Sequence, residues 1–274
     1  MVSRVIVITG STGGLGRAAA EACLGAGARV VISSESESDV ASTLSILGGE
    51  SDVLTGITCD VTVPEQVDAL RTHAVATFGR IDCWINNAGI SAPSGHAALV
   101  PRRMGEALIR INTLGTYYGS VVALRQFRQQ GSGRLINVTG RGEKGAVKGA
   151  GLYSASKSWL RTFTLSLAED EESADISVHT FNPGMMYTEL TARPRVLRGN
   201  EDAQLKGLKM VMPLIGDPPE KAGESLASYA LETDLKSREL THRSLLPLVL
   251  KRLLTGQRAE DIAAIEPQIS EPEN

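Results

Sequence analysis

The sequence predicts an α/β fold with a doubly wound parallel sheet, built as a single domain. Short apolar runs rich in β-branched residues alternate with helical patterns along the chain, which is typical of successive βα units. Several of these runs are almost wholly apolar, as expected for strands that helices cover on both faces. The chain has 274 residues, of which 42% are hydrophobic and 22% charged, enough for one large domain with a sizeable core.

The candidate strands and helices alternate along most of the chain. The expected strands are residues 5–9, 29–32, 52–59, 82–86, 133–139 and 175–181. The expected helices are residues 15–26, 64–78, 102–129, 152–171 and 219–231. Pro64 and Pro219 suit the first turn of a helix, where a missing N–H costs nothing. Residues 238–242 form at most a short strand at one edge of the sheet.

The C-terminal third of the chain interrupts this rhythm. Residues 186–217 hold several prolines and glycines, and we interpret them as a partly helical lid or substrate loop. We assign residues 1–242 to the main domain and residues 243–274 to a C-terminal helix with an acidic tail. The apolar run 244–254 is expected to pack as a helix on the body or on another subunit, in preference to a membrane. The tail from Gln257 is expected to fray.

Composition and charge exclude several classes of function. A net charge of −3 without a basic stripe, together with 4% aromatic residues, argues against a nucleic-acid partner. No uninterrupted apolar run reaches the length of a membrane span, so no integral membrane segment is expected. The three cysteines and four histidines are scattered without ligand spacing, which predicts no metal site and fits a protein of the reducing cytoplasm.

A glycine-rich turn follows the first strand directly and opens an alanine-rich helix. Gly10 permits a tight turn, Gly14 lets the backbone approach a pyrophosphate, and Gly16 allows the helix to pack closely on the strand. The helix N-terminus then presents free N–H groups and a positive dipole end to the phosphates. This context favours a dinucleotide site over an ordinary βα turn. The expected cofactor residues here are Gly10, Ser11, Thr12, Gly14, Leu15 and Gly16.

Polar residues also follow the third and fourth strands, at the edge where ligands of open α/β sheets bind. Asn87, Ala88 and Gly89 end the fourth strand, and the asparagine amide can both donate and accept hydrogen bonds. Asp60 lies just past the third strand and could accept from an adenine amino group. The alternative is that Asp60 caps the helix that begins at Pro64.

Tyr153 and Lys157 lie four residues apart in one predicted helix, so their side chains are neighbours on one face. A free tyrosine has a pKa of about 10, which is poorly matched to proton transfer at neutral pH. A lysine cation within about 4–6 Å would favour the phenolate and lower that pKa. The pair predicts a proton-transfer site. For the pair taken alone, a packing tyrosine and a solvated lysine are the alternative.

Together these motifs resemble the short-chain dehydrogenase/reductase family over residues 4 to about 190. The resemblance implies a Rossmann-type fold, a nicotinamide cofactor, and Tyr153 as general acid/base. Lys157 would bind the nicotinamide ribose, Asn112 would hold a proton-relay water, and Pro183 and Thr188 would flank the nicotinamide. The motifs, in order and with family-like spacing, are Gly10/Gly14/Gly16, Asp60-Val61, Asn86-Asn87-Ala88-Gly89, Asn112, Tyr153-x3-Lys157 and Pro183-Gly184 followed by Thr188.

One position departs from the family pattern. Members usually carry a serine about thirteen residues before the tyrosine, and this chain has Gly140 there. Losing such a hydroxyl donor typically costs on the order of a hundredfold to a thousandfold in rate. Thr139 could supply the hydroxyl if a bulge turned it, or a backbone N–H or water near Gly140 could act instead. The third explanation is a protein that binds the dinucleotide without dehydrogenase chemistry. We favour the second explanation slightly over the first.

The resemblance also carries a narrower signal. Gly140, the Pro-Gly-Met run followed by a threonine, and the leucine-rich segment near the C-terminus are similar to chlorophyll b reductase-like members. That likeness implies a bulky, apolar substrate. Met185, Met186 and Tyr187 could line an adaptable pocket for it, or could pack as core under the lid. With Gly140 they are the candidate substrate residues.

The residues at the end of the second strand decide whether NAD or NADP is bound. Ser34 stands where NAD-using relatives often carry aspartate, and Glu35 stands where many NADP-using relatives carry arginine. A carboxylate near the ribose would repel the extra phosphate of NADP, so NAD(H) is favoured over NADP(H). Arg17 could instead swing toward a phosphate.

The leading prediction is an NAD(P)-dependent oxidoreductase that transfers a hydride between nicotinamide and a carbonyl or alcohol carbon of a small-molecule substrate. The alternatives are a dinucleotide-binding regulatory protein and a non-redox enzyme of the same fold, such as a dehydratase or cyclase. By the resemblance, the helix over residues 102–129 and the Tyr153 helix would form the interface of a homodimer or homotetramer.

Overall fold

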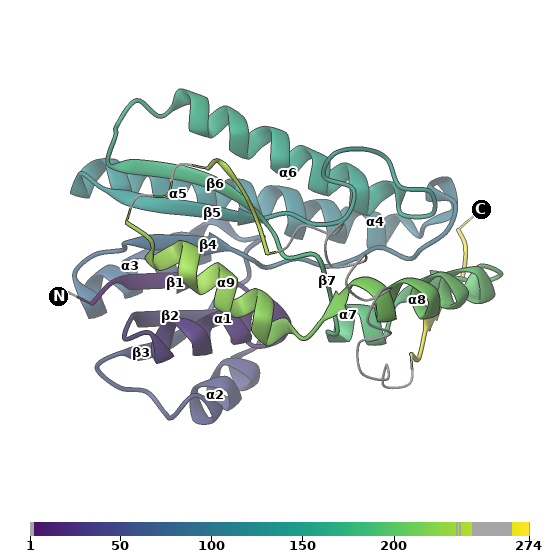
Figure 1. Ribbon diagram of the computed structural model, residues 1–274, viewed down its shortest axis with the longest axis horizontal. Helices are drawn as coiled ribbons and strands as arrows, with labels where there is room; N and C mark the ends of the chain where they lie inside the picture. Colours follow the sequence, from purple (N-terminus) through teal and green to yellow (C-terminus); the bar gives the residue numbers. More distant parts are fainter. Residues whose placement is uncertain (1–2, 234, 236, 243–264, 274) are drawn as a thin grey trace.

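The computed structural model describes residues 3–233, 235, 237–242 and 265–273 (Figure 1). The predicted helix over residues 244–254 lies outside the described residues and stays a prediction. Within the described part, one large sheet is covered by helices on both faces, and smaller elements gather beyond one end of its strands.

The large sheet is parallel throughout. Its strands are β1 (Val5–Ile8), β2 (Arg29–Ser34), β3 (Leu54–Thr58), β4 (Cys83–Asn86), β5 (Gly133–Val138), β6 (Ile176–Asn182) and β10 (Glu239–Thr241). They lie in the order β10-β6-β5-β4-β1-β2-β3, and every neighbouring pair is parallel. The strand order reverses between β1 and β4, so a ligand crevice is expected beyond the carboxyl ends of these two strands. The predicted fold class is confirmed, and residues 238–242 do supply an edge strand.

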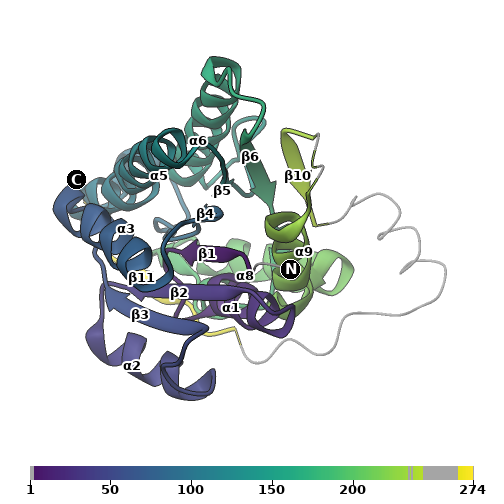
Figure 2. The same cartoon turned by 90° about the vertical axis from the view of Figure 1, so that its left-hand side faces the viewer.

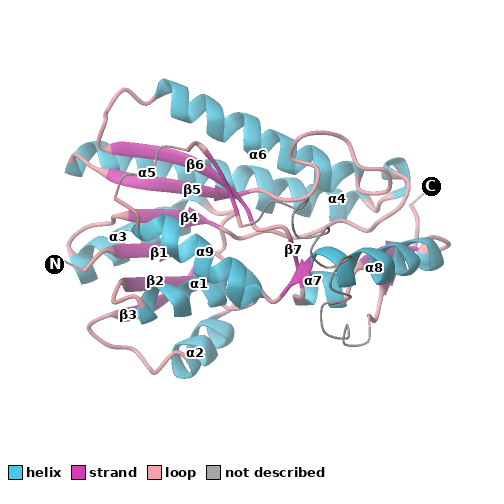
Figure 3. Cartoon of the chain, viewed as in Figure 1, coloured by secondary structure: helices cyan, strands magenta, loops and turns pink. Residues whose placement is uncertain are grey.

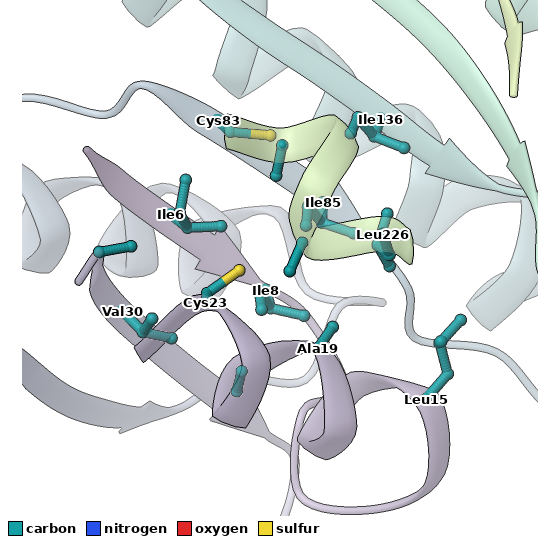
Figure 4. Packing of buried hydrophobic residues seen from close by; sticks show 14 of the residues in the cluster. Ile6, Ile8, Leu15, Ala19, Cys23, Val30, Cys83, Ile85, Ile136 and Leu226 are labelled. Carbon is teal, nitrogen blue, oxygen red and sulfur yellow. The ribbon is translucent and has the colours of Figure 1, made fainter. Parts of the chain in front are cut away.

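Helices cover each face of this sheet (Figure 2). One face carries α1 (Gly14–Gly25), α2 (Glu37–Ile46) and α9 (Pro219–Leu231), and the other carries α3 (Pro64–Phe78), α5 (Thr116–Gln130) and α6 (Gly151–Asp170). Strand side chains alternate between the two cores, so Ile6 and Ile8 pack under α1 and α9 while Val7 packs on the opposite side. Figure 4 shows Cys23 and Leu226 in the first of these cores. Among the residues that the structure describes, none of the helices combines the length and apolar character that crossing a bilayer requires.

The predicted long helix over residues 102–129 is not a regular α-helix. α4 (Arg102–Leu108) runs through a π-helical turn, η2 (Ile109–Gly115), into α5. Within this region the Thr116 hydroxyl donates to the carbonyl oxygen of Asn112 at 2.8 Å. Turns of this kind often mark functional sites, and Asn112 lies inside this one.

The helix α2 (Glu37–Ile46) was not predicted from the sequence. α2 has a serine-rich sequence in which only Val40 and Thr43 are buried, so it lacks a clear apolar stripe. Its start is defined by a side-chain cap, since Ser36 Oγ accepts from the backbone N–H of Asp39 at 3.2 Å. This helix follows β2 and packs beside the end of the strand where the adenosine of a dinucleotide would be read.

The segment 186–217 is partly helical, as predicted. It holds α7 (Glu189–Ala192) and α8 (Glu201–Ile215), and its short strands are β7 (Met185–Met186), β8 (Arg195–Leu197) and β9 (Gly216–Asp217). β7 pairs in parallel with β9, so the segment leaves the end of β6 and returns close to its starting point. Figure 3 shows α7 and α8 beyond the carboxyl ends of the strands, on the side where the crevice is expected.

The predicted fraying of the acidic tail is wrong where the structure describes it. β11 (Gln268–Ser270) pairs in parallel with β8. Arg198 and Glu271 form an ion pair next to this strand, and the backbone N–H of Glu273 donates to the Leu99 carbonyl oxygen at 3.1 Å. The tail therefore fastens the segment after β6 to the loop that precedes α4.

Candidate active site

The glycines of the first turn are required by close packing of the backbone around them. Gly10 and Gly14 have φ angles of +60° and +50°, a region that other residues rarely adopt. A Cβ added at Gly16 would lie 2.3 Å from the Gly10 carbonyl oxygen, and one added at Gly10 would lie 2.8 Å from Cα of Ala88. The turn is therefore pressed against both α1 and the segment after β4.

The start of α1 fits the phosphates of a dinucleotide. Its N-cap residue, Gly13, offers no side-chain hydrogen bond, and the first turn carries no acidic residue. A Cβ added at Gly13 would meet no atom of the described residues within 4 Å, so this side of the turn is open. The first N–H groups of the helix are thus left for an anion, which the positive end of the helix dipole favours.

The other residues predicted for this turn hold it in place. Ser11 is fully buried, and its hydroxyl donates to the Ile8 carbonyl oxygen and accepts from the Ser33 backbone N–H, both at 2.8 Å. Leu15 is buried in the core under α1, and Thr12 is half-buried. Ser11 therefore ties the turn to β2. Because its hydroxyl is already engaged, the backbone N–H groups of the turn are the ones that could contact a phosphate.

The segment after β4 is bonded to the same turn. The Asn87 side-chain amide donates to the carbonyl oxygens of Thr9 at 3.0 Å and Gly10 at 2.8 Å. The backbone N–H of Ala88 donates to Thr9 Oγ1 at 3.1 Å. The residues predicted from the ends of β1 and β4 thus lie together at one edge of the sheet.

Asp60 and Val61 lie just beyond β3. Asp60 Oδ1 accepts from the backbone N–H of Thr62 at 2.8 Å, which forms a side-chain turn leading into α3. Asp60 is not the cap of α3, because the N-cap residue is Val63. Val61 is buried, and a Cβ added at Gly115 would lie 2.7 Å from its Cγ2. The loop after β3 is therefore held against η2.

Ser34 and Glu35 stand at the end of β2. Ser34 is buried, and its hydroxyl donates to Glu35 Oε2 at 3.2 Å. Glu35 itself is exposed. A negative charge is thus held at the position where sheets of this topology bind the ribose of adenosine.

Asn112 is completely buried, and its side-chain amide is fully engaged. Nδ2 donates to the Ile90 carbonyl oxygen at 3.0 Å and to Ser156 Oγ at 3.2 Å, while Oδ1 accepts from the Ile90 N–H at 2.8 Å. A Cβ added at Gly89 would lie 3.3 Å from Asn112 Oδ1 and 3.7 Å from Lys157 Nζ. Asn112 therefore joins the loop after β4 to α6, directly beside the predicted lysine.

Tyr153 and Lys157 lie one turn apart on α6, as predicted. Lys157 Nζ is 5.7 Å from the centre of the Tyr153 ring and donates to the Val138 carbonyl oxygen at 3.1 Å. Burial raises the pKa of Tyr153 to about 12. Burial also lowers the pKa of Lys157 to about 8, an effect that the negative charge of Glu143 partly opposes. The net direction of the tyrosine pKa is therefore opposite to the predicted lowering, because desolvation of the phenol dominates.

Gly140 lies where a side chain would face the tyrosine. A Cβ added at Gly140 would be 3.0 Å from Tyr153 Oη and 3.8 Å from Lys157 Cε. The phenol oxygen therefore borders the space that a serine at this position would use. The departure from the family pattern falls inside the site itself.

Thr139 is not brought together with Tyr153. Its hydroxyl donates to the Phe181 carbonyl oxygen at 3.2 Å, its backbone N–H donates to the same oxygen at 2.9 Å, and the residue is buried. The regular register of β5 against β6 continues to the pair Val138 and Phe181, without the bulge that Thr139 would need. Its hydroxyl is therefore used within the sheet and is not directed at a substrate.

The turn after β6 folds back toward the glycine turn. Gly184 has a φ angle of +74°, and its N–H donates to Asn182 Oδ1 at 2.9 Å, beside the buried Pro183. A Cβ added at Gly14 would lie 3.3 Å from Thr188 Cγ2. The cofactor residues predicted before α1 and after β6 are thus neighbours across the crevice.

The candidate pocket residues after Gly184 differ in their surroundings. Met186 packs against the core under α1 and α9, and the Tyr187 hydroxyl donates to the Met212 carbonyl oxygen at 2.9 Å. Met185 is half-buried in β7. The core-packing alternative therefore describes Met186 and Tyr187 better than a free pocket wall does.

Three residues of this region were not assigned a role from the sequence, namely Glu143, Asn182 and Ser156. Glu143 Oε1 accepts from Asn182 Nδ2 at 2.7 Å. Ser156 Oγ donates to the Tyr153 carbonyl oxygen at 2.8 Å and accepts from Asn112 Nδ2. Ser156 could have been found from its place inside the Tyr-x3-Lys motif. Glu143 carried no comparable signal, because it lies in a charged, glycine-rich loop that could equally be a plain surface loop.

Comparisons with known proteins agree with this geometry. A family model described as short chain dehydrogenase matches residues 4–196. An L-fucose dehydrogenase from Oryctolagus cuniculus is 33% identical over 232 residues, which cover 83% of this chain and 80% of that protein. A probable chlorophyll(ide) b reductase, chloroplastic, from Arabidopsis thaliana is 32% identical over 210 residues, 68% of this chain and 42% of that longer protein. The predicted likeness to chlorophyll b reductases is therefore confirmed as a similarity.

Solved structures match the fold over nearly the whole chain. A short chain dehydrogenase/reductase from Burkholderia phymatum in complex with NAD has a TM-score of 0.76 and 21% identity, covering 96% of this chain and 98% of that one. An actinorhodin polyketide ketoreductase with NADPH has a TM-score of 0.75 and 24% identity, covering 87% and 95%. At such identities the structures establish the fold, and the family follows from the sequence matches. The chain belongs to the short-chain dehydrogenase/reductase family.

Proposed function

We propose that this chain is an NAD(P)-dependent oxidoreductase that interconverts a carbonyl and an alcohol, with Tyr153 as general acid/base. The observation that carries the proposal is that Gly89, Asn112, Gly140, Tyr153 and Lys157 meet in one place. That place lies at the carboxyl edge of the sheet, next to the glycine turn that suits a pyrophosphate. A bound nicotinamide would supply or accept the hydride, and the residues of the chain would handle the proton.

Tyr153 is the proton donor that this site offers to a carbonyl oxygen, although its pKa lies further from neutral pH than that of a free tyrosine. With a pKa of about 12, the phenol keeps its proton at neutral pH and stays available as an acid. Lys157, with a pKa of about 8, is largely protonated at pH 7 and can donate to ribose hydroxyls. The pair therefore offers a proton donor for the substrate oxygen and a cation for the ribose.

Gly140 requires another donor for the substrate oxygen. We assign this role to a backbone N–H of the turn at Gly140 or to a water held there, because the Thr139 hydroxyl already donates to the Phe181 carbonyl oxygen. The missing hydroxyl is also the one observation that favours the other candidates, a dinucleotide-binding regulatory protein or a non-redox dehydratase or cyclase. They differ from the leading proposal in binding the dinucleotide without oxidising it.

The proposed cofactor is NAD(H) in preference to NADP(H). The carboxylate of Glu35, held by the Ser34 hydroxyl, stands where the extra phosphate of NADP would come. A carboxylate and a phosphate repel each other, so Glu35 would have to be displaced or neutralised for NADPH to bind equally well.

The substrate proposed is bulky and apolar, and the assembly proposed is a homodimer or homotetramer. The first proposal rests on the likeness to a chlorophyll(ide) b reductase. The second is supported by aromatic side chains on α5 and α6, where Trp159 stacks on Phe163 with ring centres 4.7 Å apart and Tyr117 lies beside them. Tyr117 and Trp159 are 43% and 37% exposed, which is unusual for such large rings in an isolated subunit.

The compartment proposed is the cytoplasm, since the three cysteines are free and buried.

A screen of NADH and NADPH oxidation tests this function. Ketones, aldehydes and quinones of increasing size would be offered, and the dissociation constant of each dinucleotide would be measured by fluorescence in parallel. We expect NADH to bind more tightly than NADPH and to be oxidised with at least one apolar carbonyl. Binding without oxidation across the panel would favour the regulatory or non-redox alternatives, and failure to bind either dinucleotide would overturn the proposal.

A further inference from the structure

Asn112 is held by hydrogen bonds to two separate parts of the chain. Its Oδ1 accepts from the Ile90 N–H at 2.8 Å, and its Nδ2 donates to the Ile90 carbonyl oxygen at 3.0 Å. These two bonds fix which way round the amide lies, and they join η2 to the loop after β4. The second hydrogen of Nδ2 is donated to Ser156 Oγ on α6, at 3.2 Å.

Ser156 is the acceptor that this second hydrogen requires. A hydroxyl has one proton to donate and two lone pairs with which to accept. Ser156 Oγ donates its proton to the Tyr153 carbonyl oxygen at 2.8 Å, one turn earlier in the helix, so a lone pair remains for Asn112. Asn112 is completely buried and Ser156 is 5% exposed, so each group depends on the other for this bond.

The bond between Asn112 and Ser156 joins the two sides of the site. Among the hydrogen bonds of the described residues, it is the one that connects η2 with α6. On α6, Ser156 is bonded to the backbone of Tyr153 and directly precedes Lys157 in the chain. The bond therefore meets the helix between the two residues whose side chains form the proposed reaction centre.

The loop after β4 passes close to the same two sides. Gly89 precedes Ile90 in this loop, and a Cβ added at Gly89 would lie 3.3 Å from Asn112 Oδ1 and 3.7 Å from Lys157 Nζ. A loop that shifted against α6 would therefore change the spacing between Lys157 and the backbone that borders the cofactor crevice.

We propose that Ser156 is a positioning residue whose hydroxyl holds Asn112, and with it the loop after β4, in place against Tyr153 and Lys157. The inference rests on the proposed function, since these two residues are its reaction centre. The serine inside the Tyr-x3-Lys motif thereby gains a role in that reaction. Alanine at this position would remove the acceptor, leave one Asn112 N–H unsatisfied in a buried place, and free the loop to shift.

The side-chain amide of Asn112 reports this bond without turnover. In isotopically labelled protein its NMR signals would be assigned from their proximity to the Ile90 amide proton. We expect slow hydrogen exchange of this side-chain amide in the parent, and exchange at least about tenfold faster in Ser156→Ala. Ser154→Ala is the matched control, because Ser154 is also buried on α6 and donates to a carbonyl oxygen one turn earlier, that of Gly151 at 3.1 Å.

Steady-state kinetics gives the second readout. A misplacement of about 1 Å can cost about a hundredfold in rate, so we expect a smaller shift of the loop in Ser156→Ala to lower kcat by about tenfold. The NADH dissociation constant of Ser156→Ala and the kcat of Ser154→Ala should both stay within about threefold of the parent. Unchanged amide exchange or kcat in a folded Ser156→Ala protein, or equal effects in Ser154→Ala, would overturn the inference while leaving the proposed function intact. An inactive parent would instead count against the proposed function, and the exchange measurement would still decide whether Ser156 holds Asn112.

Discussion

Substituting Gly140 tests whether the site acts on a carbonyl beside Tyr153. Alanine at this position adds only a Cβ, which would lie 3.0 Å from Tyr153 Oη. Contacts this short are rare for a real Cβ, so the phenol must move by a few tenths of an ångström. A misplacement of about 1 Å can cost about a hundredfold in rate, and we therefore expect the smaller shift in Gly140→Ala to lower kcat/KM by about three- to tenfold.

Serine at the same position adds the same Cβ together with a hydroxyl. The steric loss is shared by the two variants, so the ratio of Gly140→Ser to Gly140→Ala isolates the effect of the hydroxyl. One preorganised donor at a developing oxyanion contributes on the order of a hundredfold to a thousandfold. Gly140→Ser should therefore exceed Gly140→Ala by about a hundredfold, and exceed the parent by about tenfold.

The assay is the initial rate of NADH oxidation with the best carbonyl found in the screen. Thermal unfolding and NADH affinity would be measured on all three proteins, so that folding and cofactor binding are controlled. A ratio of serine to alanine near one would refute the reasoning that Gly140 faces the reacting oxygen. An alanine variant as fast as the parent would refute the crowding of the phenol.

Three further predictions follow from the contacts of the site and the tail. Thr139→Val should leave kcat/KM within about twofold and lower the free energy of unfolding by about 1 kcal/mol, since it removes one buried hydrogen bond, and a tenfold loss of rate in steady-state assays would contradict this. Glu35→Gln should tighten NADPH relative to NADH by about fivefold in fluorescence titrations, and an unchanged ratio would contradict the charge argument. Ending the chain before residue 265 should speed hydrogen exchange of the Arg198 amide, which donates to the Ser270 carbonyl oxygen, by at least about tenfold. The Leu197 amide donates to the Ser94 carbonyl oxygen and is the internal control, so equal exchange of both amides in the two proteins would argue against a tail that fastens this segment.

The sheet could be predicted from the sequence because each strand has a recognisable local pattern of residues. Apolar, β-branched runs fill both cores, and prolines mark the starts of α3 and α9 at Pro64 and Pro219. The elements that could not be predicted from the sequence depend on contacts with distant parts of the chain. β11 is three residues long and exists because β8 lies beside it, and α2 buries too few apolar side chains to show a helical stripe. Short elements of this kind have no periodicity to read.

The site was predictable as a set of motifs but not as an electrostatic environment. Tyr153 and Lys157 do share one face of α6, and Gly140 does face them, as their spacing indicated. The direction of the tyrosine pKa was wrong because burial, which dominates it, is a property of the packed structure. Glu143 could not be assigned from the sequence for the same reason, since its bond to Asn182 joins two loops whose proximity only the fold reveals.

The most direct measurement of the central claim compares turnover and dinucleotide binding in the parent and in Tyr153→Phe. The substitution removes one oxygen from a half-buried ring and leaves the glycine turn and Lys157 in place. We expect NADH to bind Tyr153→Phe as tightly as the parent, while its oxidation with a carbonyl slows by about a thousandfold, the size of a general-acid contribution. Equal turnover of the two proteins would contradict the account.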